Sequence, residues 1–347
     1  MKLYEITIRP QSGIGTPLKG DTLFGHFCWQ VAYQPDLVEG GLEAAIEVYQ
    51  TNPFAIFSSA IPKLTGSFAR YILKRPDLPI YMLFKDKRNT DRATYYRELK
   101  NQKEKKWMIS SGKLPMSIDS VDFWDDQQLS RAIKSMSPDT VRNQIESRKD
   151  GGMCKVVEHA HNSINRLSGA TGKGAFAPFS KESLYYMPGM ELAVFVLLDE
   201  KWTDIERIVN AMVDIGRFGF GRDASIGLGR FEVSGWEERH LCFPKTTEAI
   251  YTLGPCVFQE KGASERFRFT PFTRFGRHGD RLAVSRNPFK APVIMADEGA
   301  VLLPDPSAPV LKPYVGSAVT GISKVQPNAV LQGYAPYLPL ILENENE

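Results

Sequence analysis

The segment 216–230, GRFGFGRDASIGLGR, holds the residue types best suited to bind a phosphate group. Five of its fifteen residues are glycine, which adopts positive φ and lets backbone approach closely, so several N–H groups can converge on one anion. Arginines add paired donors that match a phosphate, and a serine adds a neutral donor. The residues expected to form this site are Arg217, Gly219, Phe220, Gly221, Arg222, Ser225, Gly227 and Gly229.

Phe218 and Phe220 alternate with these glycines, and they either stack on nucleic-acid bases or anchor the loop to its domain. The other interpretation of the segment is a tight turn whose arginines pair with acids such as Asp223. A turn needs one or two glycines, so the five present favour a phosphate loop. The segment follows an expected helix and precedes an expected strand, which is the reverse of a P-loop or dinucleotide-binding turn and excludes both motifs.

A second polar segment, 159–171, has the sequence HAHNSINRLSGAT. Its two histidines share one side of an extended strand, but no carboxylate or cysteine completes a metal site, so we expect no metal. Its amides, arginine and hydroxyls suit phosphates, ribose hydroxyls and base edges. The expected RNA contacts are His161, Asn162 and Arg166, and the alternative is a loop held by its own hydrogen bonds.

A third candidate is the segment 19–26, KGDTLFGH, at the start of an expected helix. The N–H groups of a helix N-terminus and a lysine make a small anion site, for which we expect Lys19, Gly20 and Thr22. His26 follows one turn later and is a possible acid or base for a ribose 2′-hydroxyl. No second catalytic group lies beside it in the sequence, so we expect His26 to contact a partner or RNA. We expect no catalytic residue and no cofactor.

Positive charge is concentrated in the middle of the chain, although the net charge is only +3. Residues 63–181 hold 23 Lys and Arg against 13 Asp and Glu, and within them residues 85–106 hold nine against four. A second basic run, 266–290, holds seven against one. Concentrated charge of this kind is typical of a protein with a polyanionic partner, and the alternative is a solvated face.

The remaining composition favours a reducing compartment. The four cysteines are far apart and form neither a disulfide framework nor a zinc motif. The first ten residues are too polar for a signal peptide, and no apolar run approaches the roughly 20 residues that a membrane span needs. We therefore expect a cytoplasmic protein without a membrane partner.

The elements that position these segments follow from the apolar periodicity. They are a strand over 3–9, a helix over 21–33 capped by Asp21 or Thr22, strands over 55–64 and 80–84, an inserted basic arm over 85–113, short helices over 127–133 and 138–145, a strand over 190–198, a helix from Thr203 or Asp204 to about 215, and a strand over 229–234. This order approximates a β-α-β-β-α-β ferredoxin-like plan with additions. The sequence beyond residue 236 is proline-rich, has short apolar runs and indicates a second, β-rich domain.

Four segments together resemble one known family. They are GDTLFGHF, HNSINRLSGAT, FGFGRDASIGLGRFE and GYAPYLPL, and they occur in this order along nearly the whole chain. The chain resembles the RAMP superfamily of CRISPR-associated proteins, and within it the fourth subunit of type III-A Csm effector complexes. The glycine loop alone marks the superfamily, whereas its pairing with HNSINR is more specific.

The resemblance implies an α+β protein with two ferredoxin-like (RRM-like) RAMP domains, the second degenerate. We expect a domain over 1–236, with an insertion at about 85–150, and a second over 237–347. The resemblance implies a non-catalytic subunit that binds the 5′ tag of the guide RNA (crRNA) and contacts the large polymerase-like or cyclase-like subunit and a backbone RAMP subunit, in antiviral defence. It also implies that the basic arm at 85–106 corresponds to the thumb-like element that presses between nucleotides.

A different activity within the same superfamily remains open. Other RAMP proteins are metal-independent endoribonucleases that trim guide-RNA precursors. In that case His26 would be the general base, and the glycine loop would hold the scissile phosphate.

Overall fold

The computed structural model describes residues 1–64, 70–84, 91–111, 116–146, 153–240, 248–258, 266–304 and 312–342, with the backbone alone at 144–146. Residues 85–90 of the expected basic arm, and Cys242, lie outside these ranges. The described chain combines helices with large antiparallel sheets, so the predicted α+β class is confirmed.

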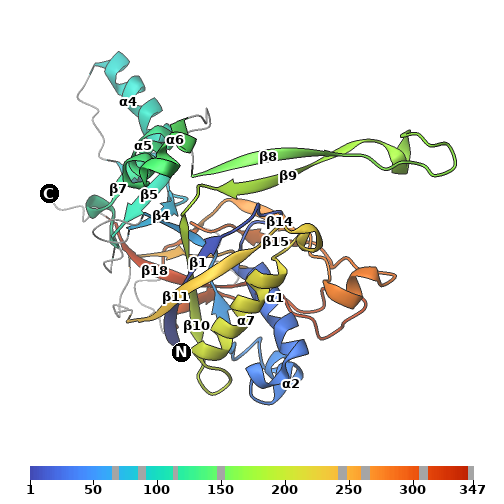
Figure 1. The fold of residues 1–347 in the computed structure, drawn as a ribbon. Helices are drawn as coiled ribbons and strands as arrows, with labels where there is room; N and C mark the ends of the chain where they lie inside the picture. The colour runs from blue at the N-terminus through green and yellow to red at the C-terminus, as the bar shows by residue number, and fades with distance from the viewer. Residues whose placement is uncertain are drawn as a thin grey trace.

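The first half is built on one antiparallel sheet with the strand order β11-β1-β10-β3 (Figure 1). Numbered as the strands of a β-α-β-β-α-β unit, this order is 4-1-3-2, the arrangement of a ferredoxin-like fold. The elements of this unit are β1 (Lys2–Pro10), α1 (Gly20–Tyr33), α2 (Gly41–Glu47), β2 (Ala55–Phe57), β3 (Ile61–Leu64), β10 (Glu191–Leu198), α7 (Ile205–Phe218) and β11 (Phe231–Arg239).

Helices α1 and α7 lie side by side over one face of this sheet (Figure 1). The alternation of β1 turns Ile6 and Ile8 towards the helices, where both side chains are fully buried. The expected apolar stripe of α1 meets them, and Leu23, Phe24 and Phe27 are buried. Asp204 caps α7 by accepting from the Arg207 N–H (2.9 Å), as expected from the sequence. The periodicity therefore predicted the central unit correctly.

A long insertion separates β3 from β10 and continues the same sheet through β4, β5 and β7. Its elements are β4 (Arg70–Lys74), α3 (Ile80–Leu83), α4 (Arg92–Glu104), β5 (Trp107–Ser110), β6 (Met116–Ser117), β7 (Asp122–Trp124), α5 (Asp126–Met136), α6 (Asp139–Glu146), β8 (Cys154–His161) and β9 (Phe179–Tyr186). Helix α4 projects from the body and has no buried residue (Figure 1).

The insertion departs from the sequence prediction in two places. The apolar run expected as a strand over 80–84 is the short helix α3, because Pro79 stands at its N-cap, where its φ of −55° suits a helix start. Such a short run is ambiguous between helix and strand from periodicity alone. The arm expected over 85–113 also ends earlier, because β5 is a sheet strand with Met108 fully buried.

Strands β8 and β9 form a two-stranded hairpin that projects from the body of the molecule (Figure 1). Each strand has eight residues and so spans about 26 Å. The hairpin joins the body at its base, where Ile14 and Leu184 exchange backbone hydrogen bonds of 2.8 and 2.9 Å. Beyond the ladder, residues 162–178 form the tip.

The second half is β-rich, and its described residues contain no α-helix. Its strands are β12 (Ala249–Thr252), β13 (Phe267–Arg268), β14 (Pro271–Arg274), β15 (Val293–Ala296), β16 (Val301–Leu302), β17 (Tyr314–Gly316) and β18 (Tyr334–Ile341). One sheet has the order β13-β16-β12-β18-β17, and β6 of the first half joins it beside β18. Strands β14 and β15 form a separate two-stranded sheet.

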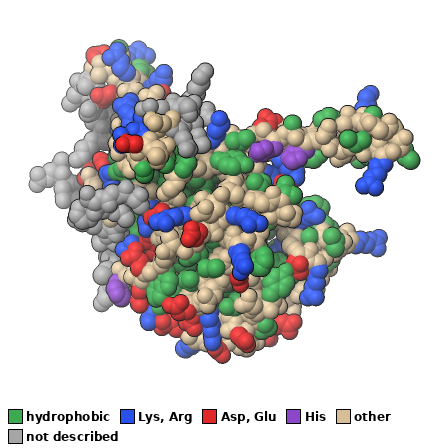
Figure 2. All heavy atoms as spheres, in the orientation of Figure 1, with side chains coloured by type: hydrophobic (Ala, Val, Ile, Leu, Met, Phe, Trp, Pro, Cys, Tyr) green, Lys and Arg blue, Asp and Glu red, His purple; other side chains and the backbone are tan. Residues whose placement is uncertain are grey.

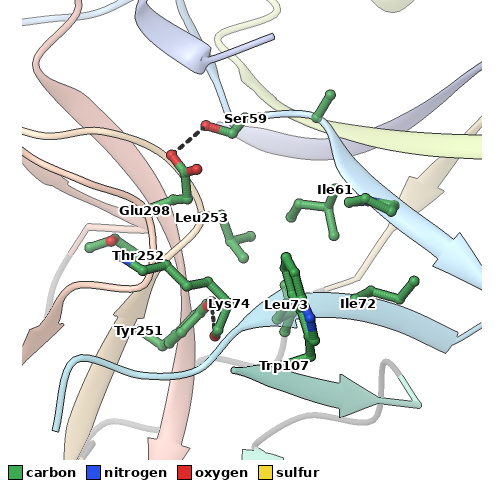
Figure 3. A pocket seen from close by; sticks show the side chains of 12 residues that line it. Ser59, Ile61, Ile72, Leu73, Lys74, Trp107, Tyr251, Thr252, Leu253 and Glu298 are labelled. Carbon is green, nitrogen blue, oxygen red and sulfur yellow. Dashed lines mark hydrogen bonds between the residues drawn. The ribbon is translucent and has the colours of Figure 1, made fainter. Parts of the chain in front are cut away.

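The two halves share one hydrophobic core, because Tyr251, Tyr334 and Leu340 pack in the same cluster as the buried residues of β1 and α1. A cavity of about 90 Å³ lies where they meet, with Ile61 and Trp107 on one side and Leu253 and Glu298 on the other (Figure 3). The Ser59 hydroxyl donates to the Glu298 carboxylate at its edge (3.2 Å).

Candidate nucleic-acid interface

The glycine loop 216–230 leaves α7 and folds back on itself before it enters β11. Gly219, Gly221, Gly227 and Gly229 all have positive φ, between 73° and 102°, and Asp223 shares this left-handed region at 61°. The Phe220 N–H donates to the Gly229 carbonyl (2.8 Å), which closes the loop at its neck. At Gly229 a Cβ would lie 2.0 Å from the Phe220 carbonyl oxygen, so only glycine fits there.

Most backbone N–H groups of this loop are bound inside the protein, contrary to the expectation that they converge on a phosphate. The Gly229 N–H donates to the Gly13 carbonyl (2.8 Å) and the Arg222 N–H to the Thr16 hydroxyl (2.9 Å). The Gly221 N–H donates to His26 Nε2 (3.1 Å). Gly219, Gly221 and Gly229 therefore serve close packing, since a Cβ at each would lie 2.0–2.6 Å from another part of the chain.

Three successive N–H groups remain at the outer turn, 223–225. Among the described residues no acceptor is bonded to the N–H of Asp223, Ala224 or Ser225. Asp223 is left-handed, and the short helical turn Ala224–Ile226 follows it. Successive N–H groups in such a turn form a small concavity for anions.

The three arginines of the loop differ in their partners. The Arg222 guanidinium donates to the Glu182 carbonyl and lies 3.5 Å from the Asp223 carboxylate, so it is engaged within the protein. Arg217 and Arg230 are exposed, and no carboxylate of the described residues pairs with either. The loop thus offers two arginines to a ligand.

The two phenylalanines of the loop point in opposite directions. Phe220, expected among the binding residues, is fully buried, and its ring centre lies 4.5 Å from that of His26. Phe218 is 67% exposed at the end of α7. Phe220 therefore anchors the loop, and Phe218 is the ring that a base can reach.

His26 is a partly buried hydrogen-bond acceptor. Burial lowers its pKa from 6.5 to about 4, so the ring is neutral at physiological pH. Since Nε2 accepts from the Gly221 N–H, the proton of the neutral ring lies on Nδ1. The one basic nitrogen is therefore occupied, which disfavours both the general base of an endoribonuclease and a direct contact with RNA.

The helix start at residues 19–22 has no free cation for an anion. Lys19 Nζ is bonded to the carboxylates of Asp297 and Glu298, the latter at 2.6 Å, and its side chain is mostly buried. Gly20 packs on β2, since a Cβ there would lie 2.2 Å from the Phe57 carbonyl oxygen. Lys19 joins the halves of the chain, and the expected ligands Lys19, Gly20 and Thr22 do not form an exposed cationic site.

Helix α1 also begins earlier than expected. Its N-cap is Lys19, whereas the predicted cap residues Asp21 and Thr22 lie within the helix. Asp21 is buried and pairs with Arg274 of β14 (2.6 Å). A buried ion pair with a residue 253 positions away is not visible in a local capping pattern.

The segment 159–171 lies on the projecting hairpin. His159 and His161 share one side of β8, as expected, and the His161 ring stacks on Phe179 with the ring centres 5.4 Å apart. Asn162 and Arg166 are exposed at the tip, together with Leu167, which is 99% exposed. Figure 2 shows Lys and Arg side chains at the far end of this hairpin, whereas acidic side chains gather at the lower edge of the body.

The glycine loop and the base of the hairpin are joined directly. Lys181 of β9 binds the Asp223 carboxylate at 2.8 and 3.0 Å, and Arg222 binds the β9 backbone. A Cβ at Gly13 would lie 2.5 Å from the Tyr185 ring, so the chain between β1 and α1 also packs here. The structure thus brings together the glycine loop, His26 and the hairpin, but not residues 19–22.

Phe218 and Arg230 lie within the glycine loop that the sequence singled out, and Phe218 was expected either to stack on bases or to anchor the loop. Lys181 is the residue of this surface that sequence reasoning missed. Lys181 has no motif around it and is placed by the pairing of β8 with β9.

No group of three potential metal ligands occurs among the described residues. No helix in the described part of the chain is long and apolar enough to cross a membrane.

Comparison with known proteins gives matches only among solved structures, since no family model and no curated protein matches the chain. A chain of a Csm3–Csm4 subcomplex in the type III-A CRISPR-Cas interference complex is 15% identical, with a TM-score of 0.52 over 98% of this chain and 99% of that one. A chain of a Csm1–Csm4 cassette in complex with cA4 is 14% identical, with a TM-score of 0.51 over the same shares. Another, in complex with pppApA, is 13% identical, with a TM-score of 0.50 over 99% of this chain and 100% of that one. Csm4 is the component common to these assemblies, so the fold of this chain is Csm4-like.

Proposed function

We propose that the chain is a non-catalytic, RNA-binding subunit of a type III-A CRISPR effector complex. In this role it binds the 5′ tag of the guide RNA and contacts a large polymerase-like subunit and a backbone subunit. The whole-chain likeness to the protein common to the Csm1–Csm4 and Csm3–Csm4 assemblies supports this role. The observation that carries it is the exposure of Arg217, Phe218 and Arg230. Most backbone N–H groups of the loop that holds them are bound inside the protein.

The chemistry of this surface suits single-stranded RNA. Arg217 and Arg230 supply charge for phosphates, the N–H groups at 223–225 supply neutral donors, and Phe218 offers a face for one base. The loop is rigid because its neck and both flanks are hydrogen-bonded, so the loop loses little conformational entropy when RNA binds.

The β8–β9 hairpin supplies the second wall of the proposed site. A two-stranded hairpin is marginally stable by itself, and this one is held at its base while its tip exposes Leu167 and Ile164. Exposed apolar side chains beside Arg166 fit a surface that meets a partner in the assembled complex. We propose that this tip, at 162–178, presses between nucleotides, in place of the basic arm at 85–106 first expected to do so.

Arginine substitutions test the proposed RNA surface. We expect Arg217→Gln with Arg230→Gln to weaken binding of a fluorescent RNA that carries the 5′ tag, and to flatten the plot of log K against log salt by roughly 1.4, because about 0.7 counterions are lost per phosphate contact with single strands. Arg222→Gln is the matched control, since Arg222 belongs to the same loop but is bound to Glu182 and Asp223. It should leave the salt slope unchanged.

Two results would contradict this assignment. Equal salt slopes for the wild type and the double variant would show that Arg217 and Arg230 do not meet phosphates. A flattened slope in Arg222→Gln alone would place the RNA on the other side of the loop.

Metal-free incubation with a repeat-containing RNA should leave the RNA intact, and cleavage that disappears in His26→Ala would restore the endoribonuclease.

A further inference from the structure

The basic run 266–290 has no part in the proposed glycine-loop site, yet it forms a second exposed surface. Strands β14 and β15 pair in antiparallel register, Phe272 opposite Met295 and Arg274 opposite Val293. The pairing continues past β14, because the Lys290 N–H donates to the Gly276 carbonyl (2.8 Å) and Arg277 lies opposite Phe289. Residues 271–296 are therefore one extended hairpin, here called the 271–296 hairpin.

The inner face of the 271–296 hairpin is bound along α1. Arg274 pairs with Asp21 at the start of α1, and Lys19 Nζ lies 5.2 Å above the Phe272 ring. At the far end a Cβ on Gly279 would lie 3.2 Å from Trp29 Nε1. Trp29 of α1 thus meets a loop of its own chain. These contacts hold the hairpin in one orientation.

The outer face of the same hairpin carries aromatic rings that are largely exposed. Phe275 is 76% exposed, Phe289 is 66% exposed and Ile294 is 71% exposed. Phe275 and Arg277 are two residues apart and so share a face, and Phe289 stands opposite Arg277. The Arg277 guanidinium lies 5.5 Å from the centre of the Phe289 ring, and it donates to the Ala283 carbonyl (3.0 Å), which holds it beside the ring.

The charge along this part of the chain is mostly positive. Residues 266–290 hold seven Lys and Arg and a single acid, Asp280. Arg281 and Arg286 are exposed, and no carboxylate of the described residues forms an ion pair with either. Uncompensated arginines around exposed rings match a strand of phosphates and bases.

We propose that the outer face of the 271–296 hairpin is a second binding surface for single-stranded RNA, with Phe275 and Phe289 stacking on bases and Arg281 and Arg286 binding phosphates. This extends the proposed function, on which it rests, because the same RNA-binding subunit then holds RNA on both flanks of α1. The glycine loop contacts α1 at His26, and the 271–296 hairpin contacts it at Asp21 and Trp29. A base-stacking surface without hydrogen-bond readout takes RNA of any sequence.

The test separates stacking from simple apolar contact. Phe275→Leu with Phe289→Leu keeps apolar side chains and removes the rings, so affinity for a fluorescent 20-nucleotide oligouridylate should fall at least about tenfold, within the range of base stacking on aromatic residues. The salt slope should stay unchanged, since no cation is lost. Val284→Ala, at a side chain 88% exposed on the same hairpin, is the matched control and should bind normally.

The arginines give the complementary readout. Arg281→Gln with Arg286→Gln should flatten the salt slope by roughly 1.4, because two phosphate contacts are lost. The side chains changed in the two double variants are all exposed: Phe275, Arg281, Arg286 and Phe289. The melting temperatures of both variants should therefore stay within a few degrees of the wild type, which checks that the variants fold.

The outcomes distinguish this inference from the function on which it rests. Weakened binding in Arg217→Gln with Arg230→Gln, but normal binding in both hairpin variants, would overturn the second surface and leave the glycine-loop site. Normal RNA binding with loss of co-assembly in the leucine variant would assign the face to a protein partner and overturn the inference. Normal binding in all variants would contradict both proposals.

Discussion

At the scale of single residues, the glycine loop is held by contacts that only glycine permits. The sequence predicted the loop from its glycine content, but it predicted that N–H groups would face a ligand. In the structure the N–H groups of Gly221 and Gly229 face the protein, because His26 and Gly13 provide acceptors from distant parts of the chain. The direction of a backbone N–H depends on such partners, and a local pattern does not reveal them.

Glycine substitutions distinguish close packing from conformational freedom. Gly229→Ala should lower the free energy of unfolding by several kcal/mol, because its Cβ would overlap the Phe220 carbonyl. Gly227→Ala is the control, since it has a φ of 97° but nothing within 4 Å of its Cβ, and it should cost about 1–2 kcal/mol from backbone strain alone. Urea unfolding measures both values, and equal losses would contradict the packing at Gly229.

The lowered pKa of the neutral His26 predicts a pH dependence of stability. Its pKa is 6.5 when exposed and about 4 in the folded protein, so between these values the unfolded chain binds the proton first. Its contribution to stability should be constant above pH 6.5 and fall by up to about 3 kcal/mol as the pH drops to 4.

His26→Gln keeps a side-chain acceptor but does not titrate in this window, which makes it the reference. Urea unfolding of both proteins at pH 7.5 and pH 5 should show a larger loss of stability for the wild type. The same loss in both would mean that His26 is free to protonate in the folded state.

At the scale of elements, the sequence predicted those with a clear period and missed those defined by pairing. Helices α1 and α7 and strands β1 and β10 have unbroken apolar patterns, and all four were expected. Strand β9 was not, because its partner β8 supplies its order and only Ser183 of its eight residues is buried. A hairpin that projects into solvent has no buried face to mark it in the sequence.

Shortening the β8–β9 hairpin tests its role without removing its anchor. Replacing residues 160–180 by Asn-Gly joins His159 to Lys181, which stand opposite each other, through a turn that suits hairpins. Lys181 and Glu182 remain, so the links to the glycine loop persist. The melting temperature should stay within a few degrees, while affinity for the tag RNA should fall. Unchanged affinity would remove the hairpin from the proposed site.

At the scale of the whole molecule, we propose that the expected domains 1–236 and 237–347 fold as one unit. The fully buried Gln332 side chain binds both the N–H and the carbonyl of Phe57, at 2.9 and 2.8 Å. The ion pairs of Lys19 with Asp297 and Glu298 cross the same junction. The sequence indicated two domains from a change in composition, and such a change carries no information about how much apolar surface the halves bury together.

Gln332→Leu tests this junction. It leaves the buried N–H and carbonyl of Phe57 without partners, at a cost of about 1–3 kcal/mol each. Unfolding followed by tryptophan fluorescence and by circular dichroism should shift to lower urea together, in one transition. Gln326→Leu, at an exposed position, is the control and should change little. Two separate transitions in the wild type would show that the halves fold independently.

The most direct test of the central proposal is photo-crosslinking in the assembled complex. The complex would be purified through a tag on this chain, with a guide RNA that carries 4-thiouridine in its 5′ tag. We expect the large and backbone subunits to co-purify, and RNA adducts to form on this chain within 217–230 and at the hairpin tip, 162–178. Adducts confined to the other subunits, with this chain present in the complex, would contradict its role in binding the guide RNA.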